Sequence, residues 1–166
     1  GTAVEFRKLP PVNCAAGTVA LWFRPDWKKS RETCIISARD EKWKGVRFYL
    51  LRTAKNGLDL SVCSPGQVQV FRTNPMQTGQ WVHIAFTWDS GKNEVVLYLD
   101  GKEAGRRTRP GAHKTGAEEM SLALFLGREG KVLSEKCGSG LYDDVLMFDR
   151  ALPPAEIAAL ALRSGK

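Results

Sequence analysis

Short apolar runs, separated by Gly, Asn, Asp and Pro, dominate the pattern along the chain. In one early run, Val19, Leu21 and Phe23 alternate with Ala20 and Trp22. Successive side chains of a β-strand point to opposite faces, so we expect one face of this strand to enter a core. Repeated short strands with turn signals between them predict an all-β sandwich or barrel.

A second alternating run covers residues 81–88. Val82, Ile84 and Phe86 are apolar and alternate with residues of mixed character. This pattern predicts a half-buried strand, with one apolar face and one face of mixed polarity.

Two further pairs of strands flank dipeptides that accept positive φ angles, which tight hairpin turns require. These pairs are 45–52 with 58–63 around Asn56-Gly57, and 94–99 with the segment from Lys102 around Asp100-Gly101. Both are expected to be β-hairpins.

The chain ends with strands and one short helix. Strands are predicted for residues 3–6, 121–126 and 141–148. Pro154 suits the first turn of a helix in which Ile157 and Leu160 share one face. We expect this helix to cap one edge of the sandwich.

The length of 166 residues, with 43% apolar and 26% charged residues, fits one compact domain, residues 1–166. No apolar run approaches the ~20 residues that cross a bilayer, so no membrane span is expected. Since the chain starts at Gly1, we expect it to be excised from a larger exported protein.

Four cysteines are spread widely, with no C-x-x-C pair to indicate zinc or thiol redox chemistry: Cys14, Cys34, Cys63 and Cys137. Two disulfides in an oxidising compartment and four buried thiols are both open readings, and the sequence selects no pairing.

The formal net charge of +7 favours acidic partners, such as sulfated or uronic glycans. Two segments concentrate it: Lys102, Arg106, Arg107, Arg109 and Lys114; and Arg24, Lys28, Lys29 and Arg31. Solvated loops are the competing interpretation for both. No DNA- or RNA-binding motif is present, so no specific nucleic-acid partner is expected.

Several motifs occur in the order found in one large family. They are residues 17–25 (GTVALWFRP), 81–88 (WVHIAFTW), 93–101 (NEVVLYLDG), Leu126-Gly127-Arg128, residues 141–152 and Glu156-Ile157. Together they resemble the laminin-G-like branch of the concanavalin A-like lectin/glucanase superfamily, over nearly the whole chain. The sequence departs from the family at Arg7-Lys8, where an acidic Gly-rich turn is common, and at Pro153, where a capping Ser or Thr is usual.

The resemblance implies a two-sheet antiparallel jelly-roll sandwich with a short C-terminal helix and with ligand loops at the rim. It also implies that Asp143 could supply one carboxylate to a structural calcium ion, although backbone carbonyls would have to provide most of the ligands. A solvated or hydrogen-bonded Asp143 is the competing interpretation. No other cofactor is predicted.

Catalysis is not expected. Hydrolases of the superfamily carry Glu-x-Asp-x-Glu on one strand, which places alternate carboxylates on one face, and no such segment occurs here. Asp143 and Asp144 are adjacent, so in a regular strand they would point to opposite faces. His83 and His113 are the only histidines, and His83 is interpreted as structural or as a satisfied surface residue. A polysaccharide lyase or glycoside hydrolase remains a minor alternative.

The five tryptophans fall into two groups, one expected to pack in the fold and one that could bind a ligand. Trp22, Trp81 and Trp88 fall in strands and are interpreted as packing residues, whereas Trp27 and Trp43 lie in lysine-rich, loop-like segments. An exposed Trp beside a cation can stack on a sugar while the cation meets carboxylate or sulfate. The competing interpretation is that each loop Trp covers an edge of the sandwich.

The sequence therefore predicts a non-catalytic binding module in an extracellular, cell-surface or periplasmic protein, with carbohydrate as its ligand and an acidic or sulfated glycan as the favoured type. A protein-interaction or adhesion domain, with an extracellular protein as partner, is the alternative. The predicted ligand-binding residues are Trp27, Trp43, Lys44, Arg106, Arg107 and Arg109, and Asp143 is the predicted metal ligand.

Overall fold

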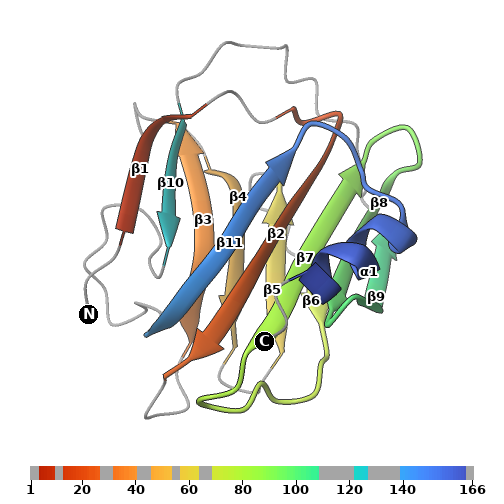
Figure 1. Ribbon diagram of the computed structural model, residues 1–166. Helices are drawn as coiled ribbons and strands as arrows, with labels where there is room; N and C mark the ends of the chain where they lie inside the picture. The colour runs from red at the N-terminus through yellow and green to blue at the C-terminus, as the bar shows by residue number, and fades with distance from the viewer. Residues whose placement is uncertain are drawn as a thin grey trace. The chain divides into compact units, whose positions relative to one another are not determined.

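A computed structural model describes eight segments of the chain, and they form β-strands and one C-terminal helix (Figure 1). The segments are residues 4–9, 13–26, 32–40, 46–53, 57–63, 69–108, 122–126 and 139–163. They belong to two compact units, each built on one antiparallel sheet. The predicted fold class, all-β with two antiparallel sheets and a short C-terminal helix, is confirmed.

The first unit carries a six-stranded sheet with the order β1-β10-β3-β4-β5-β6. Its strands are β1 (Val4–Leu9), β3 (Thr33–Asp40), β4 (Val46–Arg52), β5 (Leu58–Val62), β6 (Gln69–Phe71) and β10 (Leu122–Leu126). Ile36, Leu50 and Leu60 lie directly across from one another on β3, β4 and β5, and all are fully buried. A continuous apolar row therefore crosses the middle of this sheet.

The predicted hairpin at 45–52 and 58–63 is present as β4 and β5. Its connection is longer than a two-residue turn. The backbone N–H of Thr53 donates to the carbonyl oxygen of Gly57 at 2.9 Å, and the N–H of Gly57 donates to the Thr53 hydroxyl at 2.9 Å. A side chain as well as the backbone thus closes this loop.

The second unit carries a five-stranded sheet with the order β11-β2-β7-β8-β9, and a helix. Its elements are β2 (Ala16–Pro25), β7 (Val82–Asp89), β8 (Glu94–Leu99), β9 (Lys102–Thr108), β11 (Gly140–Phe148) and α1 (Pro154–Arg163).

Strands β2 and β7 are buried on both faces, so the predictions of one core face for residues 19–24 and of a half-buried strand at 81–88 are wrong in that respect. Every residue of Val82–Trp88 is buried. On one face Val19 pairs with Phe86, and on the other Ala20 pairs with Ala85. Ala20 and Ala85 are covered because they belong to a buried cluster that includes Leu152 and Ile157, which come from the C-terminal segment.

Helix α1 accordingly lies over a face of its sheet (Figure 1). The sequence had predicted instead that the helix would cap an edge of the sandwich. A hydroxyl from β2 anchors the chain just before the helix. The Thr18 Oγ1 accepts the N–H of Leu152 at 2.9 Å and donates to the carbonyl of Arg150 at 2.8 Å. A threonine distant in sequence therefore fixes the approach to the helix.

The second predicted hairpin is formed by β8 and β9. Asp100 and Gly101 have φ angles of 49° and 76°, as a type I′ turn requires. A Cβ atom at Gly101 would lie 3.1 Å from the Cα of Ala158 in α1, so glycine also allows the helix to approach the turn.

The oxidation state of two cysteines is relevant to the cellular compartment in which the protein works. Cys14 and Cys63 are disulfide-bonded, which excludes the reading of four buried thiols. Cys34 is completely buried in β3, and Cys137 lies outside the described residues. Since disulfides persist in oxidising compartments, the bond bears on where the protein works.

Candidate ligand-binding site

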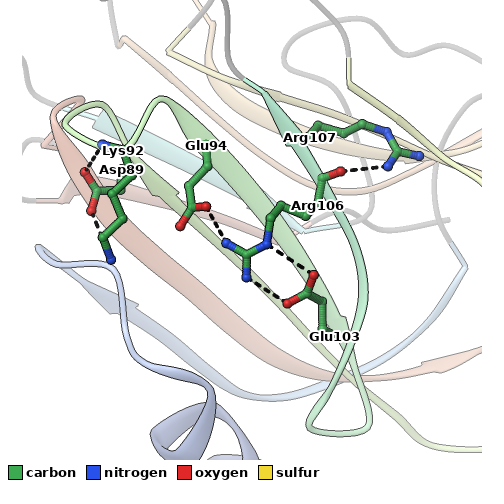
Figure 2. Close-up of polar contacts among 6 residues, drawn as sticks. All are labelled: Asp89, Lys92, Glu94, Glu103, Arg106 and Arg107. Atoms are coloured by element: carbon green, nitrogen blue, oxygen red, sulfur yellow. Dashed lines mark hydrogen bonds and ion pairs between the residues drawn. The ribbon is translucent and has the colours of Figure 1, made fainter.

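The first candidate surface is the charged side of the β8–β9 hairpin, which contains two predicted ligand residues (Figure 2). Arg106 lies between Glu94 and Glu103 (Figure 2). Its Nη2 donates to Glu103 Oε2 at 2.8 Å and its Nε to Oε1 at 3.3 Å, while Nη1 bonds to Glu94. Hydrogen bonds, to Glu103 first and then to Glu94, raise the pKa of Arg106 further above its already high ordinary value.

Arg107 differs from its neighbour in direction. Arg106 lies opposite Val96 and Arg107 opposite Val95, so the two side chains leave β9 on opposite faces of the sheet, as Figure 2 shows. The Nη1 of Arg107 donates to the backbone carbonyl of Arg106 at 2.7 Å. The two arginines therefore do not combine into one cationic patch.

The remaining predicted glycan contacts fall outside the described residues. These are Trp27, Trp43, Lys44 and Arg109. They stay predictions.

The predicted metal ligand, Asp143, is exposed on β11. Its Oδ1 accepts the backbone N–H of Asp144 at 2.9 Å. Asp144 has a φ of 46° and is also exposed, so the strand is irregular here and the two carboxylates do not follow simple alternation. Within the described segments, no three His, Cys, Asp or Glu side chains are grouped as a metal site would require. Calcium binding at Asp143 stays a prediction.

A second candidate site lies where β2 ends and β7 begins. The guanidinium carbon of Arg24 lies 5.6 Å from the centre of the Trp81 ring, a cation–π contact. Both side chains are half-buried. Trp81, which the sequence predicted to be a packing residue, is half-buried, whereas Trp22 and Trp88 are buried.

Next to this pair, on the same face, Trp22 meets His83. Their ring centres are 5.3 Å apart in an edge-on arrangement. Trp22 is 5% exposed and His83 2%. Neither the Nε1 of Trp22 nor the Nδ1 of His83 has a hydrogen-bond partner within the described part of the chain.

His83 is therefore a buried histidine and not a surface one. Its backbone N–H donates to Asp100 Oδ1 at 3.0 Å, and its carbonyl accepts the N–H of Asp100 at 2.8 Å. Burial lowers the pKa of the imidazole, and the nearby Asp100 carboxylate opposes this by raising it. The ring is thus neutral at physiological pH.

Sequence reasoning missed this group of side chains, Trp22, Arg24, Trp81 and His83. It had placed Arg24 both in the early strand and in a basic cluster, and Trp81 in a strand as a packing residue. The two-residue spacing between Trp22 and Arg24, and between Trp81 and His83, which puts each pair on one face of its strand, was visible in the sequence. The pairing of β2 with β7, which aligns Trp22 with His83, was not.

Comparison with known proteins defines the class. Residues 1–158 match the laminin G-type profile of the concanavalin A-like lectin/glucanases superfamily. The chain belongs to this superfamily.

Individual relatives are more distant. C-reactive protein of Sus scrofa is 30% identical over 102 residues, which cover 58% of this chain and 44% of the pig protein. The chain thus matches less than half the length of that relative.

Two solved structures share the fold. The native heptameric SAP-like pentraxin from Limulus polyphemus has a TM-score of 0.75 at 18% identity, over 98% of this chain and 76% of the pentraxin chain. Domain 4 of the extracellular GH43 arabinanase AbnA from Geobacillus stearothermophilus, solved with arabinotriose, has a TM-score of 0.62 at 24% identity, over 89% of this chain and 66% of that chain. At these identities the likeness shows the fold alone.

Proposed function

We propose that this chain is a non-catalytic carbohydrate-binding domain of an extracellular protein. The observation that carries the proposal is the likeness in fold to domain 4 of an extracellular arabinanase, which was solved in complex with arabinotriose. The family supports a binding role because it includes lectins.

The chemistry of the described residues supports binding over hydrolysis. Glycoside hydrolases need two carboxylates that flank the scissile bond, one of them able to donate a proton. On the β8–β9 surface, Glu94 and Glu103 are both bonded to Arg106. The two carboxylates are thus engaged with one guanidinium and do not face each other across an open site.

The location outside the cell is supported by the disulfide chemistry of Cys14 and Cys63. No helix in the described segments is long and apolar enough to cross a membrane.

The test is a glycan array that includes neutral arabino-oligosaccharides, uronic polymers and sulfated polymers, followed by calorimetric titration of any ligand found. We expect saturable binding of at least one class. Silence across the array at high protein concentration contradicts the proposal. A protein captured from an extracellular fraction, whose binding survives glycosidase treatment, would then favour an adhesion domain.

The loop tryptophans offer a second, residue-level test. If Trp27 or Trp43 is a stacking platform, its replacement by Ala lowers the affinity for the glycan by about 1–3 kcal/mol and leaves the melting temperature nearly unchanged. If the residue instead covers an edge of the fold, the melting temperature falls by many degrees. Thermal melts of Trp27→Ala and Trp43→Ala should precede the titrations.

The predicted cationic ligand contacts differ in whether a glycan anion would first have to displace a carboxylate of the protein. A ligand anion at Arg106 would have to displace two carboxylates, whereas Lys44 and Arg109 lie outside the described residues. Arg107→Gln, on the opposite face of β9, is the more informative variant of this strand. If Arg107 contacts the glycan, the substitution weakens binding more than Arg106→Gln does.

A further inference from the structure

We propose that Arg24, held against Trp81, is the subsite for the carboxylate of an acidic sugar. This inference rests on the proposed carbohydrate-binding function and names the type of sugar and the residue that recognises it. The main cationic contact for the ligand is then Arg24 at the end of β2, whereas the sequence had predicted arginines of β9.

The first argument is the difference between Arg24 and the two arginines whose carboxylate partners are defined, Arg106 and Arg150. Arg106 is bonded to Glu94 and Glu103, and Arg150 is bonded to Glu156 through both of its terminal nitrogens. No carboxylate in the described segments pairs with Arg24, and its one defined partner is the Trp81 ring. Its guanidinium therefore keeps its fork of N–H donors for an external anion.

The second argument is that the guanidinium is already held in place. Arg24 is half-buried and its guanidinium lies over the Trp81 ring, 5.6 Å from the ring centre, so less side-chain entropy is lost on binding than for an extended surface arginine. A flat, fixed guanidinium suits a planar carboxylate, which can accept two parallel hydrogen bonds from it. Trp81 acts here as a positioning residue.

The third argument is a buried hydrogen-bond donor beside the pair that has no acceptor within the described residues. Trp22 lies two residues before Arg24 on the same face of β2, and its buried Nε1–H, which can only donate, has no acceptor within the described part of the chain. The Nδ1 of His83 beside it is also without a partner there. Buried polar atoms without partners cost stability and are rare outside sites with another role. Within the described residues the Trp22 donor thus lacks an acceptor, and a carboxylate supplies acceptors only.

A backbone hydrogen bond joins the end of β2 to the segment that precedes β7. The N–H of Gly79 donates to the carbonyl oxygen of Pro25 at 2.8 Å, which ties the segment before Trp81 to the residue after Arg24. The two side chains that form the subsite are therefore presented from adjoining, hydrogen-bonded segments.

The experiment compares one oligosaccharide in two charge states: a galacturonic acid oligomer and its fully methyl-esterified form, which keeps the sugar rings but has no carboxylates. Calorimetric titrations use the unmodified protein, Arg24→Gln, Arg24→Lys and Arg72→Gln. Arg72 is the matched control because it is exposed and its loss changes the net charge equally. Thermal melts establish that each variant is folded at the titration temperature.

We expect Arg24→Gln to weaken binding of the acidic oligomer by about tenfold or more, as for loss of a charge-assisted, bidentate pair. Arg24→Lys should restore part of the affinity, because it keeps the charge and loses the fork. Arg72→Gln should change the affinity by less than about twofold, since an exposed charge that does not contact the ligand adds only a weak attraction that salt screens. Trp81→Leu should weaken acidic binding without removing the charge, as expected for a positioning residue.

The possible outcomes distinguish failure of the Arg24 subsite from failure of the proposed carbohydrate-binding function. Equal losses in Arg24→Gln and Arg72→Gln, or equal binding of the acidic and esterified oligomers, overturn the subsite while leaving a glycan-binding domain. Preference for a sulfated over a uronic oligosaccharide, with the same dependence on Arg24, overturns the assignment to carboxylate. Absence of binding to every glycan overturns both.

Discussion

Strand β7 and strand β9 belong to the same sheet, separated only by β8, yet their environments are opposite. All residues of Val82–Trp88 in β7 are buried, whereas every residue of β9 except Gly105 is exposed. β7 has a hydrogen-bonded strand on each side, and the C-terminal segment covers one of its faces. β9 is at the edge of the sheet and carries Lys102, Glu103, Arg106 and Arg107.

The difference shows that the position of a strand in the sheet decides whether its side chains are buried or solvated. A polar residue in β7, such as His83, is enclosed and has its pKa lowered. A charged residue in β9 is solvated and pairs with neighbours on the surface. Charged edge strands also discourage pairing with other chains. Four substitutions test this contrast, in order of decreasing expected effect.

The largest effect is expected for Trp88→Ala in β7. The indole is 1% exposed, its Nε1 donates to the carbonyl of Asn13 at 2.8 Å, and a Cβ atom at Gly17 would lie 2.1 Å from its ring. Removal of a ring packed this closely should lower the free energy of unfolding by about 3–5 kcal/mol in urea denaturation. The β9 control, Lys102→Ala, should stay within about 0.5 kcal/mol. A loss below about 1 kcal/mol for Trp88→Ala would show that β7 is less enclosed than its burial indicates.

The next effect is expected for Thr18→Val in β2. This change keeps the shape and removes the hydroxyl that bonds to Leu152 and Arg150. The buried N–H of Leu152 loses its acceptor, so the free energy of unfolding should fall by about 1–3 kcal/mol. Thr108→Val makes the same change on exposed β9 and should be nearly neutral. Equal effects at the two sites contradict an anchoring role for Thr18.

A smaller effect is expected in the pH dependence of stability, through His83. Burial lowers the pKa of His83 from its ordinary 6.5, so below pH 6.5 the unfolded chain binds a proton that the folded protein binds less readily. Stability is therefore retained above pH 6.5 and falls as the pH decreases through the lowered pKa. His83→Leu should remove this part of the slope in urea denaturation between pH 7.5 and pH 5.5. A slope identical to that of the unmodified protein would mean that His83 titrates as it does when unfolded.

The smallest effect is expected for Arg106→Gln on β9. Although Arg106 bonds to both Glu94 and Glu103, its side chain is 45% exposed and solvent screens the pairs. The free energy of unfolding should fall by less than about 1 kcal/mol, and by less still at high salt. A loss above about 1.5 kcal/mol would show that this network contributes more to the edge than surface ion pairs usually do.

Much of the fold followed from local pattern. The hairpin around Asp100-Gly101 was predicted because few residues other than these accept two successive positive φ angles, and both angles are positive. The strands at 121–126 and 141–148 and the helix from Pro154 were predicted within one or two residues. A tight turn was predicted at Asn56-Gly57, but the paired strands end at Arg52 and begin again at Leu58, so the connection is longer. The Thr53 side chain that helps to close it could not be recognised from the sequence.

The candidate site was much less accessible to prediction. Arg106 and Arg107 were grouped by their closeness in sequence, but adjacent residues of a strand face opposite ways, and Glu94, which bonds to Arg106, comes from the next strand. Trp81 and Arg24 are far apart in the sequence and meet only because β2 pairs with β7. No local pattern reports which strand will become a neighbour.

The sequence by itself determined where the chain is extended, where it turns and which superfamily it belongs to, because alternation, turn residues and ordered motifs are local properties of the chain. Only the tertiary structure decided that β2 and β7 are buried on both faces, that α1 lies over a sheet face, and that Arg24 rests on Trp81 without a carboxylate partner in the described segments. Burial and side-chain partners depend on which elements come to lie beside a strand, and long-range pairing fixes that, whereas the strand's own residues leave it open.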